Sequence, residues 1–154
     1  KALFLVNERI DVAMACGAAG VQLGTESLPI RLARSLLGHD SLIGSSVHDC
    51  ATACQAEVNG TDFLLAGTIF PSDSHRGITP SGPTLISEMA SVVQTPILGV
   101  GGINATNAKD VILAGAQGVA VIRSILATQD VEESARNLRL NIDCAWGELH
   151  GLIT

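Results

Sequence analysis

Aromatic residues are scarce in this chain of 154 residues, which has no tyrosine, one tryptophan and three phenylalanines. Proteins that hold single-stranded nucleic acid stack the bases on aromatic side chains, and this chain lacks such platforms. Basic residues are also few: nine lysines and arginines stand against 15 acidic residues, for a net charge of −6. Nucleic-acid backbones call for clustered positive charge, so the composition argues against nucleic acid as the main partner.

Long hydrophobic runs are missing as well, although hydrophobic residues make up 47% of the chain and charged residues only 16%. The apolar runs are short, whereas a membrane span needs roughly 20 consecutive apolar residues. The chain begins directly with a strand-like run, without a charged segment or a small-residue cleavage site, so no signal peptide is expected. The composition predicts one acidic globular domain in the cytoplasm, outside any membrane.

The four cysteines form no C-x-x-C pair and show no spacing typical of paired disulfides. Cys50 and Cys54 lie four residues apart on a predicted helix and, together with His48, could imitate a metal cluster. Structural zinc usually takes four ligands from two separated pairs. The cysteines are therefore interpreted as small buried hydrophobic residues of a reduced protein.

Short apolar runs alternate with amphipathic segments along the whole chain. Strands are predicted at residues 2–6, 20–23, 41–47, 62–69, 96–101 and 118–122. Helices are predicted at residues 10–15, 28–37, 51–58, 83–93, 108–114 and 132–149, with Asn104 and Asp130 as N-caps of the last two. This alternation is typical of βαβ units and a parallel sheet covered on both faces, so residues 1–154 are predicted to form a single α/β domain.

Two glycine-containing motifs predict a phosphate site near the end of the chain. Residues 98–104 run from a strand into the pair Gly101-Gly102, where the backbone can approach a ligand and amides can bind a phosphate dianion. Residues 118–125 form a buried strand followed by a short helical turn. In (β/α) barrels, the loops after the last two strands commonly form the phosphate site, and a long polar loop such as residues 71–82 commonly carries chemistry.

Five motifs occur in the order and at the spacing typical of one family. They lie at residues 7–13, 20–24, 44–48, 67–72 and 118–125. With them the chain resembles thiamin phosphate synthases and their TenI relatives from residue 2 to about residue 126. The resemblance implies an incomplete TIM (β/α) barrel of the thiamin phosphate synthase type, with six βα units and parallel strands, since the family has two further units before this point.

The resemblance also implies a function in thiamin biosynthesis. The family couples a pyrimidine pyrophosphate with thiazole phosphate, assisted by Mg²⁺, or isomerises a thiazole carboxylate phosphate. The phosphate of thiazole phosphate or thiamin phosphate would be bound by backbone amides and hydroxyl groups at the carboxyl-terminal mouth of the barrel. The residues implied for this phosphate are Gly102, Ile122 and Arg123 through their amides and Ser46, Ser72 and Ser74 through their hydroxyls. Asn7 and Arg76 are implied in substrate binding.

The chain departs from the family pattern in its charged residues. The family holds Mg²⁺ with two aspartates, where this chain has Glu8 and Ser27. A hydroxyl is a much weaker ligand than a carboxylate for a hard cation, so Glu8 is expected to be a weak metal ligand. A loop lysine that neutralises the pyrophosphate charge in the family is replaced by His75 in this chain. Synthase activity is therefore not expected of this chain alone.

The loop at residues 72–77 is closer to the TenI branch, some of whose members are tautomerases. The proton shift needs an acid–base group poised near neutral pH, which histidine supplies. The histidine of such a tautomerase sits where this chain has Thr68, so His48 and His75 are the candidate catalytic residues.

Two functions remain open: an enzyme of thiamin biosynthesis, and a non-catalytic module that keeps the phosphate site. A tryptophan or histidine biosynthesis barrel fits less well because of the motifs at residues 7–13 and 67–72. The first and last strands are apolar and carry no charge that would protect an open sheet edge. The sequence therefore predicts a homo-oligomer, most simply a dimer.

Overall fold

The computed structural model describes residues 2–72, 77 and 79–151 of the chain. Its strands are β1 (Leu5–Asn7), β2 (Gly20–Leu23), β3 (Leu42–Val47), β4 (Phe63–Ala66), β5 (Ile97–Val100) and β6 (Gly118–Ala120). Its helices are α1 (Ile10–Cys16), α2 (Ile30–Leu37), α3 (Cys50–Val58), α4 (Thr84–Ala90), α5 (Ala108–Leu113), α6 (Arg123–Leu126) and α7 (Val131–Leu149). Each predicted strand and helix is present, and the predicted helical turn after the last strand is α6.

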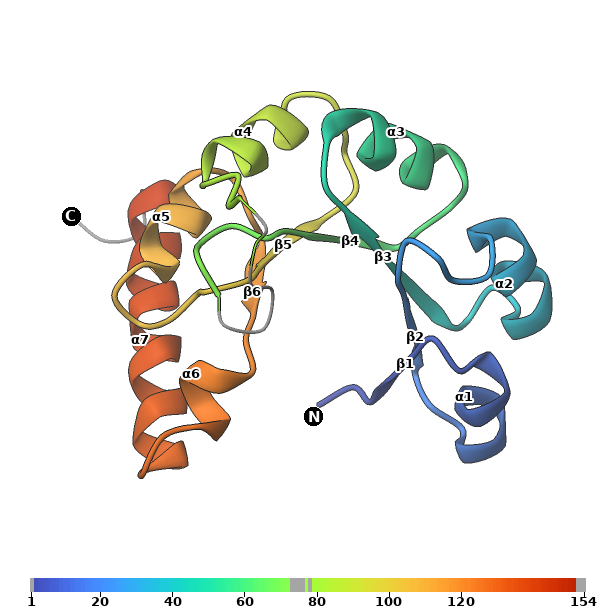
Figure 1. Cartoon of the computed structure of the whole chain (residues 1–154), viewed down its shortest axis with the longest axis horizontal. Coiled ribbons are helices and arrows are strands. Elements are labelled where there is room, and N and C mark those ends of the chain that lie inside the picture. Colours follow the sequence, from blue (N-terminus) through green and yellow to red (C-terminus); the bar gives the residue numbers. More distant parts are fainter. Residues whose placement is uncertain (1, 73–76, 78, 152–154) are drawn as a thin grey trace.

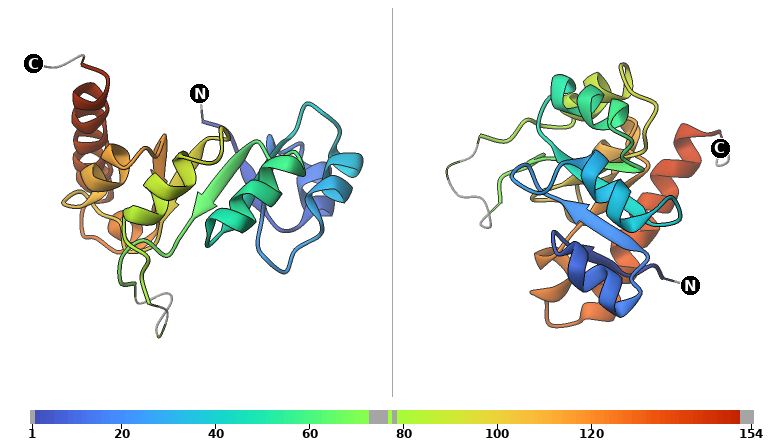
Figure 2. Two further views of the ribbon diagram at one scale, coloured as in Figure 1. Left: turned by 90° about the horizontal axis from the view of Figure 1, so that it is seen from above. Right: turned by 90° about the vertical axis from the view of Figure 1, so that its right-hand side faces the viewer.

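The six strands form one parallel sheet in which they pair in chain order, from β1 to β6. Figure 1 shows that the sheet curves into an open arc with helices around its convex side. Seen from above, α7 stands at one end of the arc and α1 and α2 at the other (Figure 2). The predicted α/β class and incomplete (β/α) barrel are confirmed. Among the described helices, none is both long and apolar enough to cross a membrane.

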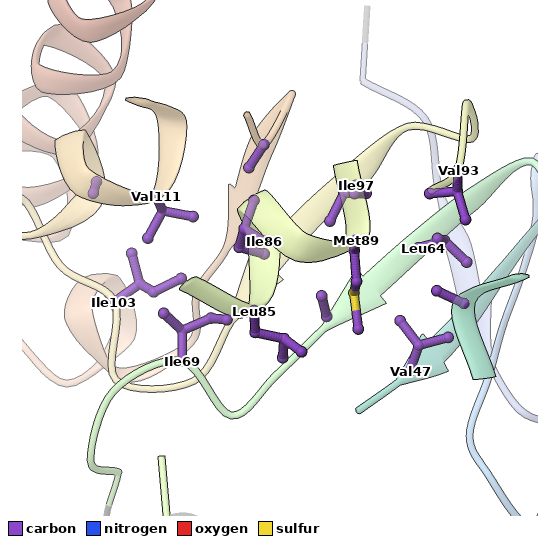
Figure 3. Close-up of a cluster of buried hydrophobic side chains, with 14 of the residues drawn as sticks. Val47, Leu64, Ile69, Leu85, Ile86, Met89, Val93, Ile97, Ile103 and Val111 are labelled. Atoms are coloured by element: carbon purple, nitrogen blue, oxygen red, sulfur yellow. The ribbon is translucent and has the colours of Figure 1, made fainter. Parts of the chain in front are cut away.

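The larger part of the core lies between the sheet and the helices. Leu64 of β4 and Ile97 of β5 are buried in one cluster with Ile86 and Met89 of α4 (Figure 3). Burying a side chain of this size stabilises the fold by about 1.5–3 kcal/mol. Successive strand residues point to opposite faces of a sheet, so the residues between these core positions face the concave side.

The concave side is less well covered than the helix side. Gln22, Ser46, Leu65 and Val100 each lie next to a buried core residue of the same strand, and each is only partly buried. Strand alternation places all four on the concave face. Since the strands are parallel, their carboxyl ends meet at one edge of this face.

Local signals mark two of the helix ends, whereas one predicted N-cap is wrong. Gly17 ends α1 in the left-handed conformation, with a φ of 61°. The side chain of Asp130 caps α7 by accepting a hydrogen bond from the Glu133 amide at 2.8 Å. The N-cap of α5 is Asn107 and not Asn104, because a helical turn at residues 105–107 separates Asn104 from the regular helix.

Other details of the sequence analysis are wrong as well, among them the ends of the fourth strand, found at Ala66 and not at residue 69, and of α4, found at Ala90 and not at residue 93. The first strand begins at Leu5 and not at residue 2, since a strand needs a neighbour as well as apolar side chains, and Phe4 remains 64% exposed. All four cysteines are free thiols, but none is buried as predicted: Cys50 and Cys54 are half-buried, and Cys16 and Cys144 are exposed. Cysteine is usually a buried residue, but Cys16 of α1 and Cys144 of α7 lie on helix faces that point away from the core.

Candidate functional site

Two neighbouring cavities lie at the carboxyl ends of the strands, where a (β/α) barrel carries its ligand sites. The first cavity, of about 370 Å³, lies at the ends of β5 and β6. The second cavity, of about 270 Å³, lies at the ends of β2, β3, β4 and β5. Val100 and Gly101 line both, so one elongated ligand can contact the two cavities together.

Gly102 brings the backbone to the edge of the first cavity. Its φ of 64° lies in the left-handed region, and a Cβ atom there would lie 2.4 Å from the carbonyl oxygen of Pro71. The side chain of Asn107 donates a hydrogen bond to the Gly102 carbonyl oxygen at 3.1 Å. The backbone conformation and the lack of space both require glycine at this position.

The first cavity is lined by groups that suit an anion. In the part of the chain that the structure describes, the Gly102 and Ile122 amides donate to no protein acceptor. Arg123, the first residue of α6, lines the cavity and carries a positive charge. Ser124 also lines it, and its buried hydroxyl oxygen has no partner among the described residues. Available amides and a cation are the groups that bind phosphate in proteins.

His48 lines the second cavity together with Ser46 and Thr68. Its Nδ1 lies 2.5 Å from the carbonyl oxygen of Gly67. A carbonyl oxygen can only accept, so Nδ1 carries the proton, and Nε2 of the neutral ring keeps a lone pair. A ring in this tautomer can take up a proton at Nε2, as an acid–base catalyst must.

The backbone beside His48 is held by the start of α3. Asp49 is the N-cap of this helix, and its Oδ1 accepts a hydrogen bond from the Thr52 amide at 2.7 Å. This backbone hydrogen bond lowers the pKa of Asp49 below its ordinary value. The cap therefore ties the end of β3 to the helix that follows it.

Glu8, the predicted metal ligand, directly follows β1. Its Oε1 accepts a hydrogen bond from the Ser27 hydroxyl at 3.1 Å, and the Ser27 oxygen accepts one from the Gly24 amide at 2.8 Å. One carboxylate and one hydroxyl are a poor donor set for Mg²⁺, which prefers carboxylate oxygens. Within the described ranges, no group of three or more His, Cys, Asp or Glu side chains could hold a metal ion. These residues do not fit a strong Mg²⁺ site.

The structure brings together about half of the residues that the sequence singled out. The predicted residues that line the two cavities are Ser46, His48, Ser72, Gly102, Ile122 and Arg123. Asn7 is exposed at the end of β1, and neither Asn7 nor Glu8 lines either cavity. Ser74, His75 and Arg76 lie outside the described residues.

Three residues near the cavities were not predicted from the sequence. Thr25 and Ser124 line them, and Gln22 donates a hydrogen bond from Nε2 to the Ser46 hydroxyl at 3.1 Å. Gln22 could have been found, because it is the polar residue between Val21 and Leu23 in a short apolar strand. Thr25 and Ser124 carry no such signal.

Comparisons with known proteins give one consistent result. The thiamine monophosphate synthase family matches residues 1–125. Thiamine-phosphate synthase of Pyrococcus horikoshii is 39% identical over 142 residues, 92% of this chain and 68% of that protein. The enzyme of Chlorobium limicola is 45% identical over 139 residues, 90% of this chain and 66% of that protein.

A solved structure extends this result to three dimensions. Thiamine phosphate pyrophosphorylase from Pyrococcus furiosus superimposes with a TM-score of 0.87 at 37% identity, over 95% of this chain and 70% of that one. The chain thus spans about two thirds of the length of these relatives. The matched family, the identities and the shared fold show that the chain belongs to the thiamine monophosphate synthase family.

Proposed function

We propose that the chain binds a phosphate ester of thiamin biosynthesis, either thiazole phosphate or thiamin phosphate. The phosphate group occupies the first cavity, and the ring system extends into the second. The observation that carries this proposal is the pair of amides, from Gly102 and Ile122, that donate to no acceptor in the described chain while they line one cavity. The names of the relatives supply the class of ligand.

The groups around the first cavity favour an anion even though the chain as a whole is acidic. The chain as a whole carries a net charge of −6, so its general field repels a phosphate. A local set of donors must therefore outweigh that repulsion. The amides of Gly102 and Ile122, with Arg123 and the hydroxyls of Ser72 and Ser124, form such a set around the first cavity.

The site favours binding over synthase chemistry. Loss of pyrophosphate from the pyrimidine substrate needs compensation of a large negative charge, and the pair Glu8 and Ser27 is a poor ligand set for Mg²⁺. The proposed activity of this chain alone is therefore ligand binding without synthase turnover. A coupled assay of pyrophosphate release tests this point, and turnover on the order of 10 per second would contradict it.

Tautomerisation of a thiazole carboxylate phosphate is the second candidate function. His48 favours it, since its tautomer leaves a lone pair on Nε2 beside the second cavity. His48→Gln would then abolish turnover and leave the affinity for thiamin phosphate nearly unchanged. If His48→Gln keeps the wild-type rate, the residue is structural.

Binding is tested by titration of the labelled protein with thiamin phosphate and, as a matched control, with thiamin, which lacks the phosphate. Amide NMR signals of Gly102 and Ile122 should shift with thiamin phosphate and with inorganic phosphate, and much less with thiamin. Equal shifts with thiamin and thiamin phosphate, or none at these two residues up to millimolar phosphate, would refute the phosphate site.

We also propose that the chain self-associates in the cytoplasm through its open sheet edges. The outer strands of the sheet are β1 and β6, and neither carries a charged residue. Such edges are open to pairing with another strand. Light scattering decides the point, since a stable monomer at micromolar concentration would contradict it.

A further inference from the structure

We propose that Gln22 is a positioning residue that makes the Ser46 hydroxyl a hydrogen-bond donor toward the ligand. Ser46 lines the second cavity, whereas Gln22 lines neither cavity and acts through Ser46. The inference deepens the proposed function and rests on it, because it requires a ligand in the second cavity. It assigns a role to a side chain on the concave face of β2 that the phosphate site does not use.

The side-chain amide of Gln22 has a defined orientation. Its Nε2 lies 3.1 Å from the carbonyl oxygen of Leu23 and 3.1 Å from the Oγ of Ser46. The Leu23 carbonyl oxygen can only accept a hydrogen bond, so the atom that faces it must be the amide nitrogen. The two N–H bonds of this nitrogen are then both used, and Ser46 Oγ is an acceptor.

Gly44 provides the space for this amide. It pairs with Gln22 in the register of β2 and β3, and it lies two residues before Ser46 on the same face of β3. A Cβ atom on Gly44 would lie 2.2 Å from Oε1 of Gln22 and 2.1 Å from the ring of Phe63. The amide is thus held between neighbouring strands, within reach of Ser46.

The consequence for a ligand follows from the chemistry of a hydroxyl group. Serine has one hydrogen to donate, and the Ser46 oxygen already accepts from Gln22. No acceptor for that hydrogen occurs among residues 2–72, 77 and 79–151, so it remains for a ligand in the second cavity. The Ser46 hydroxyl then favours an accepting atom, such as a phosphate oxygen or a ring nitrogen, since a ligand donor would leave the Ser46 hydrogen without an acceptor.

The substitution Gln22→Glu tests the direction of the hydrogen bond between Gln22 and Ser46 with almost no change in side-chain shape. At pH 8 the new carboxylate only accepts, so it takes the Ser46 hydrogen and leaves none for the ligand. We expect thiamin phosphate to bind about tenfold more weakly than to the wild type, the effect of one hydrogen bond. As the pH falls toward 5, the partly buried carboxyl gains a proton and becomes a donor again, so the ratio of affinities returns toward one.

Two comparisons separate this effect from charge repulsion and packing. The same Gln22→Glu change in a Ser46→Ala background keeps the repulsion between carboxylate and phosphate but has no hydroxyl to redirect. The further loss there should be smaller than about threefold. Gln22→Met keeps the volume of the side chain and leaves the Ser46 hydroxyl able to donate. The ratio of its affinity to that of the wild type should therefore not depend on pH. Glu8 and His48 are unchanged in all these proteins, so any contribution they make to the pH dependence cancels in the ratio to the wild type.

Calorimetry with thiamin phosphate and with inorganic phosphate supplies the readout, and thermal unfolding checks that each variant folds. An equal loss from Gln22→Glu with and without Ser46 would overturn the inference and leave the proposed function intact. The same holds for equal, pH-independent losses in Gln22→Glu and Gln22→Met. If Gln22→Glu does not fold, Ser46→Ala alone must weaken binding about tenfold for the inference to stand. A wild-type protein that binds neither ligand would overturn the proposed function as well.

Discussion

Gly102→Ala is the substitution that most directly probes the proposed phosphate site. Alanine at a φ of 64° adopts the left-handed conformation, which costs about 1–2 kcal/mol for a residue with a Cβ atom. That Cβ would also lie 2.4 Å from the carbonyl oxygen of Pro71 and 2.7 Å from that of Phe70. Both are backbone atoms, so relief requires movement of the loop, at a further cost of about 1–3 kcal/mol. The expected loss of stability is about 2–5 kcal/mol.

Gly17→Ala is the matched control for this experiment. Gly17 has nearly the same φ, 61°, but a Cβ there would meet nothing within 4 Å. Its substitution should cost only the conformational term of about 1–2 kcal/mol and leave ligand binding unchanged. The difference between the two variants isolates the crowding at the cavity edge.

Urea unfolding, followed by circular dichroism, measures both losses, and calorimetry measures the affinity for thiamin phosphate. Gly102→Ala should lose binding by more than its loss of stability explains, because the Gly102 amide is moved from its place. Equal destabilisation by the two substitutions would refute the steric argument. Wild-type affinity in folded Gly102→Ala would refute the placement of the phosphate.

Three further predictions concern residues that lie outside the two cavities. Asp49→Ala removes the cap of α3 and should cost about 1 kcal/mol of stability. The pKa of Asp49 is lowered in the folded state, so the stability that Asp49 contributes is complete above about pH 4 and is lost as the pH falls through the lowered pKa. Urea unfolding of the wild type and the variant at pH 7 and below pH 3 measures this loss. Arg34→Ala should cost about 2–3 kcal/mol of stability, since Arg34 donates to the Ser41 carbonyl oxygen and to Asp62 at the amino ends of the strands. The affinity of this variant for thiamin phosphate should stay unchanged in calorimetry. Ser27→Asp adds a carboxylate beside Glu8 and should tighten Mg²⁺ binding about tenfold in the same assay, whereas Ser35→Asp on exposed α2 should not.

The order of helices and strands could be predicted from the sequence because it depends on neighbouring residues. The apolar runs around Leu64 and Ile97 have the length of buried strands, and the glycine after α1 and the aspartate before α7 mark helix ends through local hydrogen bonds. The first strand was misplaced since its pairing depends on β2, which is distant in the sequence. Apolar residues alone do not set a strand boundary.

The backbone features of the proposed phosphate site could also be predicted from the sequence, for the same reason. Gly101 and Gly102 follow a strand directly, and Arg123 opens a turn directly after another, so their backbone roles need only local geometry. Parallel strands bring both loops to one end of the sheet, which makes their proximity a consequence of the fold class.

Which side chains act together was decided by the tertiary structure alone. Gln22 and Ser46 are 24 positions apart, and they meet because the register of β2 and β3 sets them on one face and Gly44 leaves room between them. His48 meets the Gly67 carbonyl in the same way, while Asn7 stays outside both cavities. Residue types and local turns are properties of short stretches of chain. A tautomer or the direction of a hydroxyl hydrogen depends on atoms from several strands, and these come into contact only once the sheet has formed.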